Sequence, residues 1–124
     1  MKSTRFLSPP LDIQSTGFDV GAALARLGGN ASLLHELVSR FVREHASSAD
    51  DVDALVAAHK PAQAVAALHR LKGAARIVGA VALADAAQRA EDLLMVGDAA
   101  GLPSFRTALD AACVQCKAIV PGRT

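Results

Sequence analysis

The chain has 124 residues, a length that suits one domain with its own core, and 52% of them are hydrophobic, mostly Ala, Leu and Val. Ala and Leu favour helices, whereas β domains are rich in β-branched and aromatic residues, so an all-α fold is predicted. The formal charge is +1 and the basic residues are scattered, which argues against a nucleic-acid partner. No apolar stretch approaches the roughly 20 residues that cross a bilayer, and no direct membrane contact is expected.

The first part of the chain is predicted to be an extended arm or linker followed by a short helix. Residues 1–16 contain two adjacent prolines and several Ser and Thr, which predict an extended arm or linker. A short helix is predicted from Val20 to Leu27. Asp19 is its expected N-cap, and the pair Gly28-Gly29 its expected end.

Asn30 is expected to cap a longer helix with an inward stripe at spacings of four and three. The stripe consists of Leu34, Val38, Phe41, His45, Ser48, Val52 and Leu55. At Ser47-Ser48 this helix either kinks or breaks, and the pattern does not decide between the two.

Three further long helices follow. Pro61 begins the first, and Gly79 marks the turn to the second. Gly97 ends the second, and Ser104 caps the last. Their inward stripes are Ala64, Leu68, Leu71, Ala75 and Val78; Leu83, Ala87, Ala90 and Leu94; and Phe105, Leu109, Ala112, Cys116 and Ile119. This pattern predicts an antiparallel four-helix bundle over residues 17–120, with a short additional N-terminal helix and a tail at 121–124.

A second face of the helix that starts at Pro61 carries polar residues within ALHRLKGAARIVGA. His69 lies off the apolar stripe and is expected to face solvent. Lys72, Gly73 and Arg76 follow it by three, four and seven residues, which puts them on the same face. A glycine inside a helix costs on the order of 1 kcal/mol relative to alanine, so Gly73 calls for a reason.

Close access to the imidazole is that reason. Without a Cβ at Gly73, another protein can approach His69 closely. Two cations on the same face attract an anion bound to the ring, and a solvent-facing imidazole has a well-populated neutral, nucleophilic form at physiological pH. The pattern predicts a histidine that accepts a phosphoryl group.

The same residues carry a resemblance to a known family. The pattern HxxKG followed by GA, together with the upstream segment GFDVGAALARLGGNASLLHELVSRF, resembles the histidine-containing phosphotransfer (HPt) domain, especially the C-terminal HPt modules of bacterial hybrid sensor histidine kinases. The resemblance covers roughly residues 17–120. The matching positions are His69, Lys72, Gly73, Gly79, Ala80, Leu83 and Glu91.

The resemblance implies that His69 takes a phosphoryl group from a phospho-aspartate of one receiver domain and passes it to an aspartate of a response regulator. Lys72 would help to neutralise the phosphoryl oxygens, and Gly73 would leave room for the receiver's active site. The family often has Ser or Thr where this chain has Arg70 and Ala74. Those departures affect which receiver docks rather than the chemistry.

The expected partners are receiver domains of response regulators and hybrid kinases, which bind transiently to a monomer through a small interface. Arg70, Arg76 and Gly79 are the expected partner contacts around His69. No cofactor is expected, and Mg²⁺ would come from the partner's acidic pocket because no carboxylate cluster here suits it. The chain has no GxxxxGK[ST] loop or glycine-rich nucleotide lid, so it is expected to be a phosphocarrier and not a kinase.

One ring nitrogen of His69 attacks, so the other is expected to carry the proton and donate it to an acceptor. Glu91 is the candidate. It lies 12 residues past the Gly79 turn and His69 lies ten before it, so the two sit at similar height in antiparallel helices.

Two other classes of protein stay open. One is a helical module that docks receivers without accepting phosphate, although the intact His69, Lys72 and Gly73 argue against it. The other is a metal- or ligand-binding bundle, which would need converging ligands such as Glu-x-x-His pairs, and the sequence contains none.

The remaining histidines and the cysteines have ordinary expected roles. His45 is expected in the core with a hydrogen bond, and His35 and His59 at the surface. Cys113 and Cys116 are too few for a disulfide framework or a zinc site, so they are expected to fill the core of a protein in the reducing cytoplasm.

Overall fold

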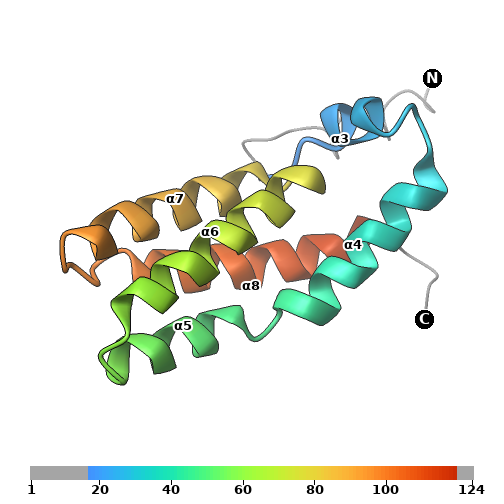
Figure 1. Ribbon diagram of the computed structural model, residues 1–124. Coiled ribbons are helices and arrows are strands. Elements are labelled where there is room, and N and C mark those ends of the chain that lie inside the picture. Colours follow the sequence, from blue (N-terminus) through green and yellow to red (C-terminus); the bar gives the residue numbers. More distant parts are fainter. Residues whose placement is uncertain (1–16, 120–124) are drawn as a thin grey trace.

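The computed structural model describes residues 17–119, and their fold is all-α, as predicted (Figure 1). The helices are α3 (Val20–Arg26), α4 (Ala31–His45), α5 (Ser48–Ala57), α6 (Pro61–Ile77), α7 (Val81–Met95) and α8 (Leu102–Ile119). The predicted arm at 1–16 and tail at 121–124 lie outside the described residues. In the part of the chain that is described, no helix is long and apolar enough to span a membrane.

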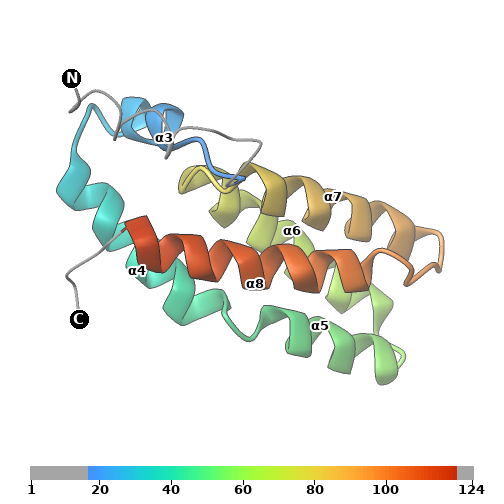
Figure 2. The ribbon, with the colours of Figure 1, turned by 180° about the vertical axis from the view of Figure 1, so that it is seen from behind.

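The long helices form the predicted antiparallel bundle. α6 and α7 lie side by side as a hairpin, and α8 runs behind them (Figure 1). α4 and α5 follow one another along the remaining side and together take the place of one long helix; both contact α8, which faces the viewer in Figure 2. The short α3 lies across the end of the bundle where α6 turns into α7 (Figure 1).

The core is built largely from the predicted apolar stripes; Leu55, predicted on one of them, is only partly buried. All the stripe residues expected on α6 and α7 are buried, and so are Phe105, Leu109, Ala112 and Cys116 on α8. The side chain of Ile119 lies outside the described part. Apolar residues at helical spacing bury together because this removes their surface from water, and this burial holds the helices of the bundle together.

The predicted helix between 31 and 57 breaks, which settles the alternative that the sequence left open. α4 ends at His45 and α5 begins at Ser48. The two intervening residues shift the phase of the stripe, so Ala49 rather than Ser48 is buried, and His45 is only half-buried. The expected place of His45 in the core is therefore met only in part, since the residue lies at the edge of the core.

His45 spans the break between the two helices. Its Nδ1 lies 3.4 Å from Ser48 Oγ, and its ring packs against Phe41 at a centroid distance of 5.0 Å. Of the two histidines expected at the surface, His59 is exposed and His35 is half-buried.

Folding stability should fall on acidification because of His45. Burial lowers its pKa from the ordinary 6.5; Glu44 opposes this and Arg70 adds to it. The pKa of His45 is lower in the folded state than in the unfolded state. Its contribution to the free energy of unfolding is therefore complete above pH 6.5 and is lost as the pH falls toward the folded-state pKa. Urea unfolding of His45→Gln between about pH 7.5 and pH 5 should show a flatter pH dependence than the wild type. Parallel curves would contradict this.

The caps follow the sequence at three helices and depart from it at the fourth. Asp19 accepts a hydrogen bond from Ala22 N at 2.9 Å, Asn30 accepts one from Leu33 N at 3.0 Å, and Pro61 is the first residue of α6. α8 begins at Leu102, before the predicted cap at Ser104. A proline in the first helical turn loses nothing, because its missing N–H would have no partner within the helix.

The two cysteines lie on the last helix. Cys116 is buried, and burial raises the pKa of its thiol to about 12. The half-buried Cys113 has a smaller rise in pKa, also caused mainly by burial.

Alkylation should therefore distinguish the two thiols, because the thiolate is the reactive form. At about pH 8, iodoacetamide should label Cys113 in the folded protein, and Cys116 only after unfolding. Peptide mass spectrometry measures both sites in one experiment. Labelling of Cys116 at the rate of Cys113 in the folded protein would show that the C-terminal half of α8 opens.

The turn between α6 and α7 is held by the segment before α3. Gly79 has φ +82, and a Cβ there would lie 2.7 Å from the carbonyl oxygen of Asp19, so glycine is required for both conformation and space. Asp19 N donates to Gly79 O at 2.7 Å, and Ala82 N donates to Gly17 O at 3.0 Å. These contacts attach α3 to the hairpin that presents His69.

Candidate functional site

α6 presents His69 to solvent in the middle of the bundle. The neighbouring Leu68 and Leu71 are buried in the core, whereas the His69 side chain is 66% exposed. Each residue of a helix advances by about 100°, so a residue next to the buried stripe points outward. The ring is held on a rigid element and is open to another protein.

Lys72 departs from the sequence-based expectation. It was expected on the exposed face of His69, but its residue exposure is only 7%, and its side chain lies between α6 and α7. The position three residues after His69 is rotated by about 60° toward the Leu68–Leu71 stripe, whereas those at four and seven stay within about 40° of the ring. Gly73 and Arg76 are accordingly exposed.

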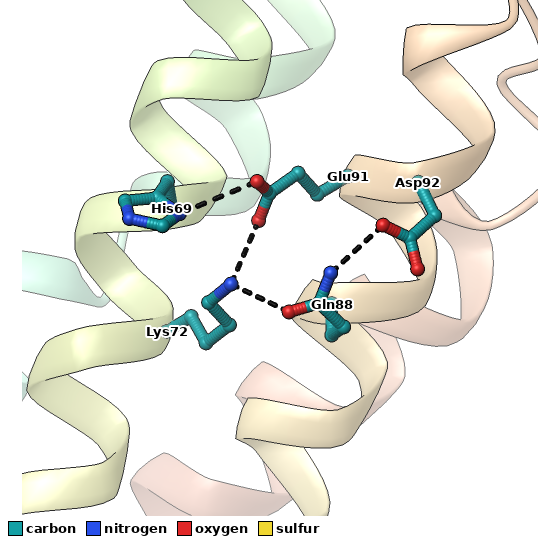
Figure 3. Close-up of polar contacts among 5 residues, drawn as sticks. All are labelled: His69, Lys72, Gln88, Glu91 and Asp92. Atoms are coloured by element: carbon teal, nitrogen blue, oxygen red, sulfur yellow. Dashed lines mark hydrogen bonds and ion pairs between the residues drawn. The ribbon is translucent and has the colours of Figure 1, made fainter.

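Glu91 of α7 lies between His69 and Lys72 (Figure 3). Its Oε2 is 3.3 Å from His69 Nδ1, and its Oε1 is 3.2 Å from Lys72 Nζ. The carboxylate only accepts hydrogen bonds, so a neutral His69 carries its proton on Nδ1 in this contact and leaves the lone pair on Nε2. Figure 3 shows this second nitrogen turned away from Glu91.

Sequence reasoning missed two residues of this network, Gln88 and Asp92. Lys72 Nζ donates to Gln88 Oε1 at 2.5 Å, and Gln88 Nε2 donates to Asp92 Oδ1 at 2.8 Å (Figure 3). The available signal was spacing: Gln88, Glu91 and Asp92 lie three and four residues apart, and so share a face of α7.

Gly73 leaves the backbone of α6 bare one turn after His69. A Cβ built there meets no atom within 4 Å, so the packing of the described chain does not call for a glycine. Its cost in helix stability is therefore unexplained by the fold, and the open surface next to the ring is its visible consequence.

The residues predicted to contact a partner differ in their exposure. Arg70 and Arg76 are exposed on α6, whereas Gly79 is buried under α3 and offers little surface to a partner. Contact of all three with a partner stays a prediction. A shallow cavity opens at this end of the bundle, lined by Asp19, Ala22, Arg26, Arg76, Gly79, Val81, Ala84 and Asp85.

Metal ligands do not converge in the described part of the chain. Among residues 17–119, no group of three or more His, Cys, Asp or Glu side chains is placed to hold a metal ion.

The family model of the Hpt domain matches residues 36–119, which is more than half of the chain and includes His69, Lys72, Gly73 and Glu91. Neither the curated proteins nor the solved structures gave a match. Hpt domains carry phosphoryl groups and are not kinases, and they act with receiver domains in phosphorelays. The chain therefore belongs to the Hpt domain family and has a phosphotransfer role in two-component signalling.

Proposed function

We propose that His69 is the phosphorylated residue, which accepts a phosphoryl group from a receiver phospho-aspartate and passes it to an aspartate of a response regulator. The contact of His69 Nδ1 with Glu91 Oε2 carries this proposal, because it leaves Nε2 as the exposed nucleophile. The bare backbone at Gly73 supports it, since a receiver must bring its aspartate close to the ring.

In the transfer, the lone pair on Nε2 attacks phosphorus while the bond from phosphorus to the aspartyl oxygen breaks, and its electron pair leaves with the carboxylate. Nδ1 keeps its proton, so the phosphorylated ring is cationic and lies next to the negative Glu91. The reverse attack by the next receiver's aspartate regenerates neutral His69. Phosphoryl transfer needs positioning and charge compensation more than covalent machinery, and these side chains supply both.

Lys72 has a part in the charge balance. Its ammonium group has three N–H donors, two of which contact Glu91 and Gln88, so one remains for a phosphoryl oxygen. Its charge also compensates the buried Glu91 carboxylate. Arg76 is the exposed cation of the same face, two turns further along α6.

The proposed partners are receiver domains that dock transiently on a monomer, with Arg70 and Arg76 beside the histidine. The Mg²⁺ used in phosphoryl transfer would be bound by acidic residues of the receiver. We place the protein in the cytoplasm, since its two free thiols suit a reducing compartment. We infer that it is a phosphocarrier without ATP-binding machinery, either as part of a hybrid sensor histidine kinase or as a separate protein.

Glu91→Ala should slow phosphoryl transfer about tenfold to a hundredfold, the range seen when the partner that orients a metal-bound histidine is removed. The bundle should stay folded, because Lys72 keeps Gln88 as an acceptor. Quench-flow transfer from a phosphorylated receiver measures the rate, and circular dichroism monitors the fold. An unchanged rate in the folded variant would remove Glu91 from the mechanism.

The proposal as a whole is tested with a panel of phosphorylated receiver domains mixed with the wild-type chain. Label should move onto the chain, should be acid-labile and base-stable, and should pass on to a second, unphosphorylated receiver. Binding of receivers without any label would indicate instead a module that docks receivers and accepts no phosphate.

A further inference from the structure

The orientation of the Gln88 amide is determined by its two neighbours. Asp92 Oδ1, a carboxylate oxygen, can only accept, and Lys72 Nζ can only donate. The NH₂ end of the amide must therefore face Asp92, at 2.8 Å, and the carbonyl end must face Lys72, at 2.5 Å. The positions of the amide oxygen and nitrogen of Gln88 therefore follow from the hydrogen-bonding chemistry of its two neighbours.

Lys72 depends on this amide. Its side chain is 9% exposed, so its N–H groups need acceptors from the protein. Nζ contacts both the Gln88 oxygen and Glu91 Oε1, so two acceptors on α7 hold the lysine (Figure 3). Without the Gln88 oxygen, Nζ would have only the Glu91 carboxylate to bind.

The contact with His69 depends in turn on how Glu91 is shared. One carboxylate oxygen binds Lys72 and the other contacts His69 Nδ1. A lysine no longer held by Gln88 can move to contact both oxygens, which draws Oε2 away from the ring. The histidine then has no fixed acceptor, and its proton distributes over both ring nitrogens.

We propose that Gln88 is a positioning residue for the reaction. Held by Asp92, it keeps Lys72 against Glu91 Oε1, and thereby keeps Glu91 Oε2 on His69 Nδ1 and the lone pair on Nε2. Its effect on transfer rests on the proposed function of His69, whereas its effect on the ring does not.

The test is ¹⁵N NMR of the His69 ring in the unphosphorylated protein at a pH where the ring is neutral. In the wild type, the two nitrogens should have the well-separated shifts of one tautomer. In Gln88→Met the shifts should move toward each other, and transfer should slow by about tenfold, the lower end of the range for such outer partners. Asp92→Ala, which removes an exposed acceptor, should move the shifts in the same direction by less.

Gln115→Met is the matched control. It makes the same chemical change at a half-buried position of α8 and should leave the His69 shifts unchanged. Wild-type shifts in both folded variants, Gln88→Met and Asp92→Ala, would overturn the proposal. If the shifts move as expected but the wild-type chain takes no phosphoryl group, the proposed function fails while the positioning role stands.

Discussion

His69→Gln should abolish phosphorylation of the chain. An amide nitrogen has no lone pair available for attack, so no label should pass from a phosphorylated receiver, where the wild type is labelled. The side chain is 66% exposed, so the change in the free energy of unfolding should stay within about 0.5 kcal/mol. Receiver binding should persist, since the surrounding surface is unchanged.

The matched control is His35→Gln, the same substitution at a half-buried position of α4. This variant should be labelled like the wild type. Label on His69→Gln would place the phosphorylated group elsewhere in the chain, and loss of label from both variants would indicate a general defect.

Gly73→Leu should separate folding from transfer. The position is in a helix with open space around it, so the leucine fits, and the free energy of unfolding should rise by up to about 1 kcal/mol. The same side chain projects toward an approaching receiver next to the ring. A displacement of about 1 Å in the reacting groups costs on the order of a hundredfold in rate, so transfer should fall by at least this factor.

Chemical denaturation and single-turnover transfer on the same preparation measure the two effects of Gly73→Leu. Ala111→Leu, which adds similar bulk at an exposed position of α8, should leave transfer unchanged. A normal rate in folded Gly73→Leu would refute the role of access. A less stable bundle would show that the glycine serves the fold.

The fold could be predicted from the sequence because each long helix has a continuous apolar stripe with clear ends. Leu68, Leu71 and Ala75 on α6 are such a stripe, and burial of its members leaves one orientation for the helix. Gly79, Asp19 and Asn30 lie at helix ends as their local chemistry predicts. The geometric basis of the prediction for Glu91, its height opposite His69, could also be read from residue counts.

The features that the sequence did not predict depend on small rotations about a helix axis and on contacts between helices. Lys72 lies at the edge between the apolar stripe and the exposed face, and only the presence of Glu91 and Gln88 on α7 turns it inward. Spacing within one helix says nothing about such a partner. At Ser48, the break between α4 and α5 changes the phase of the stripe by an amount that periodicity alone does not give.

The position of the phosphoryl group on the ring tests the proposed role of His69 most directly. We would phosphorylate ¹⁵N-labelled protein with a receiver and record ³¹P and ¹⁵N spectra of the His69 side chain. We expect one phosphorus–nitrogen bond, at Nε2, with the proton retained on Nδ1 opposite Glu91. A phosphoryl group on Nδ1, or on another residue with His69 unmodified, would contradict it.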